Sequence, residues 1–90
     1  MIKYAQSDIS DGINSLKIGV GNVVSCLLRK ELTEYTLPFQ LNYLITVGAL
    51  REMFGTASFL YSDKYVSLSI DGLSVCIHFY PENTKFTLKT

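Results

Sequence analysis

The fold of this chain is decided by residues 64–80, which read KYVSLSIDGLSVCIHFY. Apolar and polar side chains alternate on both sides of Asp71-Gly72, with the two-residue period of a strand that buries one face. Asp-Gly is preferred in two-residue hairpin turns, where both residues need positive φ. Such a turn puts Ile70 opposite Leu73 and fixes the register, so the apolar residues of both strands fall on one face. The opposite face is rich in Ser and Tyr and is expected to contact water. The predicted buried face consists of Val66, Leu68, Ile70, Leu73, Val75 and Ile77.

Strand patterns continue on both sides of this hairpin. Residues 57–61 form a candidate strand that ends at residues 62–63. After the hairpin, residues 81–83 (Pro-Glu-Asn) have turn composition, and residues 85–88 alternate as a last strand. Three or four antiparallel strands are therefore expected to close the chain.

A helix is predicted before these strands, over residues 40–54. Gly55 stands where a helix commonly stops, and Pro38 precedes the start, where a missing N–H does no harm. Gly48 in the middle lowers helix stability by about 1 kcal/mol relative to Ala. Since the usual reason for such a glycine is close packing, we predict that another backbone approaches the helix at Gly48. The predicted buried face has helical spacing and consists of Leu41, Leu44, Ile45, Gly48, Ala49 and Met53.

The first third of the chain has weaker patterns. Residues 2–5 and 13–20 are candidate strands, and residues 22–32 fit either a strand or a helix. The Val-Val pair near the start of residues 22–32 favours the strand, which would put Val24, Cys26 and Leu28 on one face. As a helix capped by Asn22, the segment would instead present Val24, Leu27, Leu28 and Glu31.

Together these elements predict one α+β domain over residues 1–90. It consists of an antiparallel sheet with one main helix, in the order β-β-β-α-β-β-β. A chain of 90 residues with 48% hydrophobic content is long enough for one domain and too apolar for a disordered protein.

Charge and hydropathy narrow the class of protein. Eight Lys and Arg offset eight Asp and Glu, so no overall basic excess draws the chain to nucleic acid. The apolar stretches are too short to span a bilayer, and the N-terminus lacks the pattern of a signal peptide. We therefore expect a cytoplasmic protein without membrane contact, in which Cys26 and Cys76 are reduced thiols.

The residues predict no catalytic group, metal site or cofactor. His78, the only histidine, falls on the Ser- and Tyr-rich face of the hairpin, where a surface or subunit-contact role is favoured over general-base catalysis. The carboxylates are scattered without the spacing of a metal site. Arg29-Lys30 is the only adjacent basic pair and is a candidate phosphate contact.

Four stretches, taken in order, resemble part of a known protein family. Residues 2–12 (IKYAQSDISDG) look like a strand followed by an acidic, Gly-containing turn, and residues 14–18 look like the next strand. Residues 35–54, which include FQLNYL at 39–44, look like a strand that leads into a helix, and residues 57–89 look like three closing strands. This order resembles that of DNA sliding clamps, the ring-shaped processivity factors of replicative polymerases, over nearly the whole chain.

The resemblance implies an incomplete clamp domain. A clamp domain contains two β-α-β-β-β units, and this chain is similar to its C-terminal two-thirds, without the first helix and the preceding strand. One such piece cannot encircle DNA, and its exposed sheet edges invite pairing with another chain. The resemblance therefore implies a homo-oligomer or a complex with a full-length clamp subunit.

The resemblance also implies two sets of site residues. Basic residues of clamp helices meet DNA phosphates, which implies that Arg51, with Lys64 close by in sequence, contacts double-stranded DNA. Arg29 and Lys30 remain candidate DNA contacts because of their adjacent positive charges. The partner-peptide groove of clamps lies near the C-terminal strand, which implies an interface at this end of the chain. The expected interface residues are Phe86, Leu88, Tyr80 and His78.

Two functions from different classes follow. The first is a non-enzymatic DNA-replication accessory protein that resembles a truncated sliding clamp and acts by protein–protein assembly. The alternative is a small phage-type inhibitor or adaptor that binds one host protein without contacting nucleic acid, which the neutral charge and small size suggest. A small enzyme that uses His78 is the least favoured function.

Overall fold

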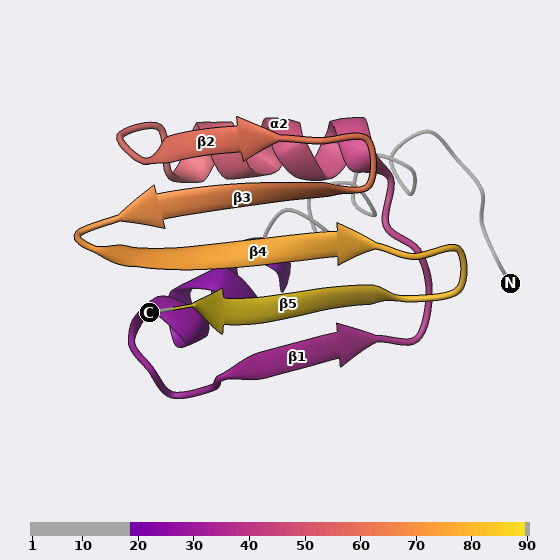
Figure 1. The fold of residues 1–90 in the computed structure, drawn as a ribbon, viewed down its shortest axis with the longest axis horizontal. Helices are drawn as coiled ribbons and strands as arrows, with labels where there is room; N and C mark the ends of the chain where they lie inside the picture. The colour runs from indigo at the N-terminus through magenta and orange to yellow at the C-terminus, as the bar shows by residue number, and fades with distance from the viewer. Residues whose placement is uncertain (1–18, 90) are drawn as a thin grey trace, which may run out of the picture.

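The computed structural model describes residues 19–89, which form one five-stranded antiparallel sheet with two helices on one of its faces (Figure 1). The strand order across the sheet is β1-β5-β4-β3-β2, so β1 and β2 are its edges. The predicted α+β class is confirmed. The strands are β1 (Glu34–Leu37), β2 (Ser58–Tyr61), β3 (Tyr65–Ile70), β4 (Leu73–Phe79) and β5 (Thr84–Lys89), and the helices are residues 19–28 and α2 (Tyr43–Met53).

The central hairpin of β3 and β4 forms as predicted. Asp71 and Gly72 have φ of 52° and 81°, the positive values that this two-residue turn requires. Ile70 pairs with Leu73 across the turn, and the predicted register continues along both strands. The fully buried members of the predicted face are Val66, Leu68, Val75 and Ile77.

The hairpin is extended on both sides by strands predicted from the sequence. Residues 57–61 and 85–88 correspond to β2 and β5, and the turns predicted at residues 62–63 and 81–83 separate the strands. Four strands follow α2 instead of the three in the order β-β-β-α-β-β-β. The last of them, β5, lies between β4 and β1 and so brings the first and the last strand of the described chain side by side.

Residues 19–28 are helical, which corrects the preference for a strand over residues 22–32. Val20, Val24 and Leu27 have helical spacing, and all three are buried in the core. The burial of this face outweighs the β preference of the neighbouring valines, because tertiary contacts routinely override intrinsic propensity. Asn22, considered as a cap in the helical alternative, lies inside the helix.

The strands predicted in the first third of the chain can be compared only in part. Residues 2–5 lie outside the described residues, and so do residues 13–18 of the predicted strand 13–20. Residues 19 and 20 are helical. The described part of the chain therefore has two helices where one main helix was expected.

The main helix, α2, begins at Tyr43 instead of residue 40. Asn42 is its N-cap, and the Asn42 Oδ1 accepts a hydrogen bond from the backbone N–H of Ile45 at 2.9 Å. This bond satisfies one of the donors that a helix N-terminus leaves free. The buried residues of α2 are Thr46, Ala49 and Leu50.

The face of α2 that packs on the sheet differs from the predicted one. Leu44 and Met53 are 78% and 40% exposed. Most positions of α2 are apolar, so their spacing does not define a single face. An added Cβ at Gly48 would meet no atom within 4 Å, whereas one at Gly21 would lie 2.5 Å from the Met53 sulfur. The close approach predicted at Gly48 is therefore wrong, and the tight contact lies between the two helices at Gly21.

A buried threonine ties β5 to the link between β1 and α2. Thr84 is fully buried. Its Oγ1 accepts a hydrogen bond from the backbone N–H of Leu41 at 2.8 Å and donates one to the carbonyl of Phe39 at 2.9 Å. One side chain thereby satisfies two backbone groups distant in sequence and holds the start of α2 against the sheet.

We predict that Thr84→Val destabilises the protein by about 1–3 kcal/mol, because valine has the same shape but leaves the Leu41 N–H and the Phe39 carbonyl without their partner. Urea unfolding followed by circular dichroism measures the change. Thr87→Val is the matched control, since it makes the same change on the other face of β5 and should shift stability by less than about 0.5 kcal/mol. Equal losses in the two variants would contradict the assigned role.

Two glycine substitutions should have opposite effects on stability. Gly72→Ala places a side chain at φ 81° and should cost about 1 kcal/mol. Gly48→Ala removes a flexible residue from an exposed position in α2 and should add about 0.5–1 kcal/mol. Thermal unfolding of both variants against the parent protein measures these shifts. A loss of stability in Gly48→Ala would show that the position is crowded.

Candidate functional site

The face of the sheet opposite the helices is polar and is turned toward the viewer in Figure 1. The pairing of β3 with β4 brings Ser69 beside Ser74, and their Oγ atoms lie 2.8 Å apart in a hydrogen bond. On the neighbouring strands, Lys85 Nζ lies 3.5 Å from Glu34 Oε1. We call this surface the open face. Its residues on β3 and β4 are Tyr65, Ser67, Ser69, Ser74, Cys76 and His78.

An aromatic row crosses the open face. Tyr65 pairs directly with His78 across β3 and β4, and their ring centroids lie 5.2 Å apart. Tyr80, two residues further along the chain, stacks on His78 at 5.7 Å with an interplanar angle of 13°. On the other side of the imidazole, Cys76 Sγ lies 3.6 Å from His78 Nδ1. The imidazole is thus held between two tyrosine rings and a thiol.

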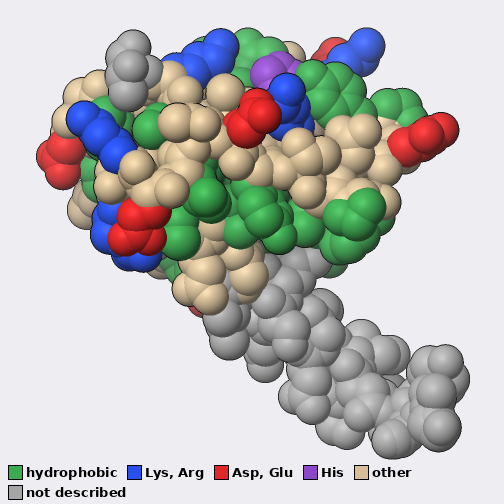
Figure 2. Space-filling model, turned by 90° about the horizontal axis from the view of Figure 1, so that it is seen from below, with side chains coloured by type: hydrophobic (Ala, Val, Ile, Leu, Met, Phe, Trp, Pro, Cys, Tyr) green, Lys and Arg blue, Asp and Glu red, His purple; other side chains and the backbone are tan. Residues whose placement is uncertain are grey.

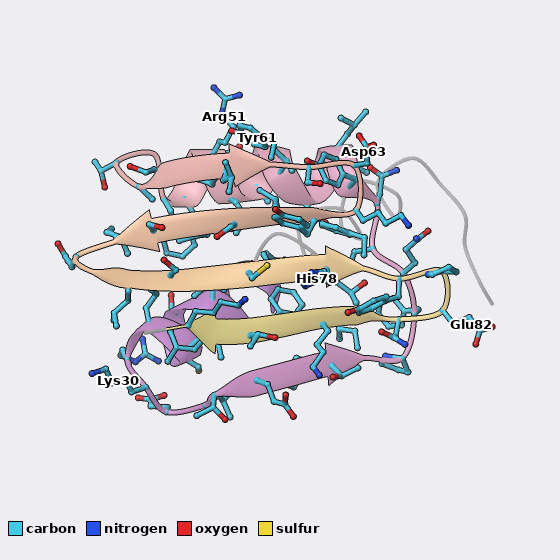
Figure 3. All side chains as sticks on the ribbon, viewed as in Figure 1. Lys30, Arg51, Tyr61, Asp63, His78 and Glu82 are labelled. Carbon is cyan, nitrogen blue, oxygen red and sulfur yellow. The ribbon has the colours of Figure 1, made fainter. Side chains whose placement is uncertain are left out.

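A shallow cleft of about 410 Å³ opens at the end of this row. The turn between β2 and β3 brings Asp63 to this end of the sheet, and Figure 3 shows its position relative to His78. An aromatic ring beside a lysine is an arrangement that can contact a planar or anionic group. The cleft is lined by Gln40, Asp63, Lys64, His78, Phe79, Tyr80 and Pro81.

This cleft gathers three of the residues that the sequence singled out. Lys64 was predicted to contact DNA, and His78 and Tyr80 were predicted to contact a partner. Tyr80 is exposed, whereas His78 is half-buried between its aromatic neighbours. The hairpin register explains the meeting of His78 with Tyr65. It also places Lys64 opposite Phe79, whose backbone N–H donates to the Lys64 carbonyl at 2.8 Å.

The other basic residues predicted to contact DNA lie elsewhere. Arg29 follows helix 19–28 and holds Glu31 through two contacts, Nε to Oε2 at 3.0 Å and a second guanidinium nitrogen to Oε1 at 3.3 Å. These hydrogen bonds raise the pKa of Arg29 and lower the pKa of Glu31. Lys30 and Arg51 lie at opposite margins of the sheet in Figure 3. The four basic residues therefore do not form one continuous patch.

Two predicted interface residues lie on the helix-covered side of the sheet. Phe86 pairs with Ile77 and is completely buried, and Leu88 packs half-buried against the same core. Because β5 lies between β4 and β1, its backbone is paired on both sides. Phe86 is therefore a core residue, which corrects its place in the predicted interface.

The two cysteines are free thiols in different surroundings. Cys76 lies on the open face but is buried by its neighbours, and Cys26 is half-buried on helix 19–28. Burial raises the pKa of Cys76, and the charge of Lys89 offsets this only in part. A thiol with a raised pKa forms less of the reactive thiolate near neutral pH. Within residues 19–89, His, Cys, Asp and Glu nowhere come together as a group of three able to hold a metal ion.

The edge strand β2 presents backbone groups that the sheet does not use. In an antiparallel pair, residues that exchange hydrogen bonds with the neighbouring strand alternate with residues whose N–H and C=O point away from it. The Ser62 N–H donates to the Tyr65 carbonyl at 2.9 Å, so the backbone groups of Ser62 point toward β3. The residues one and three positions before Ser62 therefore point their backbone N–H and C=O groups away from β3. These residues are Tyr61 and Phe59, whose rings stack at 6.1 Å on the helix side.

The edge strand β1 is constructed in the same way but carries different residues. The Leu88 N–H donates to the Thr33 carbonyl at 2.9 Å, so the backbone groups of Glu34 and Thr36 point away from β5. Figure 2, which views the molecule from the β1 side, shows apolar side chains gathered over this margin. The exposed large apolar residues in and just after β1 are Tyr35 and Phe39.

These edges are the structural feature that sequence patterns located least well. The apolar alternation identified β2 as a strand but could not say that it is an edge, because strand order depends on pairing far along the chain. One available signal was the composition of residues 58–61, Ser-Phe-Leu-Tyr, in which both faces carry a large apolar residue. Leu60 and Tyr61 are 61% and 48% exposed on opposite faces of the strand.

Comparisons with protein-family models, curated proteins and solved structures give no match for this chain. Within residues 19–89, neither helix combines the length and the hydrophobicity that a membrane-spanning helix requires. Function is therefore inferred from the residues and surfaces described above.

Proposed function

We propose that this chain is a non-enzymatic accessory protein of DNA replication that works like a detached piece of a sliding clamp. It acts by pairing a free edge of its sheet with another polypeptide, either a second copy or a full-length clamp subunit. The observation that carries this proposal is the pair of open edges, β1 and β2, whose outward backbone groups have no strand beside them among the described residues.

The physical basis of the proposal is the tendency of a free strand to recruit another. Unpaired N–H and C=O groups along an edge form a template for a further strand. Exposed apolar residues accompany these groups at both edges, with Tyr35 and Phe39 at β1 and Leu60 and Tyr61 at β2. An added strand would satisfy the backbone and bury apolar surface at the same time, as in recognition by β-augmentation.

The order of elements supports the clamp form of this proposal. From β1 onward the chain runs strand, helix and four strands, so it contains the β-α-β-β-β order of the unit that clamp domains repeat, followed by the additional strand β5. α2 lies on one face of the sheet and leaves the other face open (Figure 1). In this arrangement neighbouring units would join through the sheet edges. Arg51, which lies on α2, would be the basic residue on the helix side of the sheet.

A second candidate function is an adaptor or inhibitor that binds one protein and does not contact nucleic acid. The scattered positions of the basic residues favour it, since phosphate binding needs several cations along one surface. Arg29 is already held by Glu31, and Lys30 and Arg51 lie far apart across the sheet (Figure 3). Both candidate functions use the sheet edges, so DNA binding distinguishes them.

Light scattering during size-exclusion chromatography tests assembly. We expect the full chain to elute as an oligomer, or to shift the elution of a bacterial or phage sliding clamp when the two are mixed. The control is the double variant Thr36→Lys/Leu60→Lys, which places a charge on each edge strand and should abolish both effects while circular dichroism stays unchanged. A monomer that also ignores the clamp would refute the proposal.

Retention on immobilised double-stranded DNA at increasing salt tests the choice between the two candidates. A clamp-type protein should be retained at low salt and released as salt rises, because phosphate contacts release counterions. Arg51→Ala and Lys64→Ala should each weaken this retention. If the parent protein passes through at about 50 mM salt, where phosphate contacts are strong, the result favours the adaptor function and removes DNA contact from the first proposal.

A further inference from the structure

We propose that β2 is the assembling edge and that its partner is the β2 strand of a second copy, paired antiparallel about a twofold axis that passes between the two Leu60 residues. The inference rests on the proposed function and specifies its partner and register. The sheets of the two copies would then join into one continuous sheet, with both sets of helices on the same side.

The outward backbone groups of β2 define which residues can pair. Phe59 and Tyr61 point their N–H and C=O groups away from β3, whereas Leu60 points its groups toward β3. Two copies can therefore form hydrogen-bonded pairs only between residues of the first kind. Each such pair exchanges two N–H···O bonds, so two symmetric pairs give roughly four across the axis.

One register uses these groups completely. When Phe59 faces Tyr61 of the second copy, the twofold symmetry repeats the pair, and Leu60 faces its own copy between them. Aromatic pairs then meet on the helix side, and two exposed leucines meet on the open face, where cross-strand apolar contacts stabilise a sheet. Shifting the register by two residues would place Leu60 opposite Ser58 or Ser62, which would lose the contact between the leucines.

Charge favours a second copy at this edge. The residues of β2 (Ser58–Tyr61) carry no charge, so two identical strands can approach without repulsion between like charges. The whole chain has a formal net charge of zero, which also leaves little repulsion between copies.

The other edge carries features that limit pairing. Glu34 lies on β1 with its carboxylate 3.5 Å from Lys85 Nζ, so a strand added at this edge would have to accommodate charged side chains. Pro38 follows directly after β1 at an outward position and has no N–H to donate. Charged residues and proline are the devices by which natural sheets protect an edge. β2 has neither of them.

Oxidative cross-linking tests the register. In a non-hydrogen-bonded pair the Cα atoms lie about 4.5 Å apart, within the range that a disulfide spans. Leu60→Cys should therefore give a covalent dimer on mild oxidation, linked between the two copies of residue 60 as mapped by peptide mass spectrometry. Ser58→Cys is the matched control, because the two copies of residue 58 would lie about 13 Å apart along the strands. We expect Leu60→Cys to cross-link at least about 10-fold faster.

The possible outcomes separate this inference from the proposed function. Equal cross-linking rates for the two variants overturn the register. If the parent protein is an oligomer whose mass falls in Thr36→Lys but not in Leu60→Lys, assembly uses β1, and the inference fails while the proposed function survives. The same holds if the chain is monomeric alone but binds a clamp. Loss of the oligomer in Leu60→Lys alone, with rapid cross-linking of Leu60→Cys, supports the inference.

Discussion

The structure depends on the register of one hairpin. Asp71 and Gly72 both adopt positive φ values, so they join β3 to β4 in a two-residue turn that fixes the register of the two strands. With Ile70 opposite Leu73, each apolar residue of the two strands falls on the same face. A shift of one residue would turn this entire set toward solvent, because side chains alternate strictly along a strand. This one turn therefore determines which face of β3 and β4 is apolar and packs in the core.

The remaining architecture follows from that one-sided surface. Helix 19–28 and α2 both pack on the apolar face, and β5 adds Phe86 to the same core. Thr84 then holds the link before α2 against β5 through two buried hydrogen bonds. Since both helices cover one face, the other face remains polar, with an aromatic row that ends in a cleft. Within residues 19–89 the sheet does not close, so β1 and β2 are its edges, and these carry the proposed assembly.

The helices and the site were harder to derive from residues than the hairpin. Residues 19–28 contain β-branched residues that favour a strand, and only packing of Val20, Val24 and Leu27 against the sheet decides for a helix. α2 is apolar around most of its circumference, so its buried face is decided by where Thr84 and the sheet hold it. Of the predicted site residues, Lys64, His78 and Tyr80 meet at the cleft, whereas Phe86 belongs to the core.

Residue patterns alone predicted the α+β class, the central hairpin with its register, the existence of β2, β5 and the main helix, and the polar character of the open face. These features depend on local rules, namely the period of side-chain alternation and the φ angles that a turn demands. The strand order, the helical state of residues 19–28, the burial of Phe86 and the identity of the two edges became apparent only from the folded arrangement. These features depend on contacts between residues distant in sequence, and no local pattern records which strand lacks a neighbour.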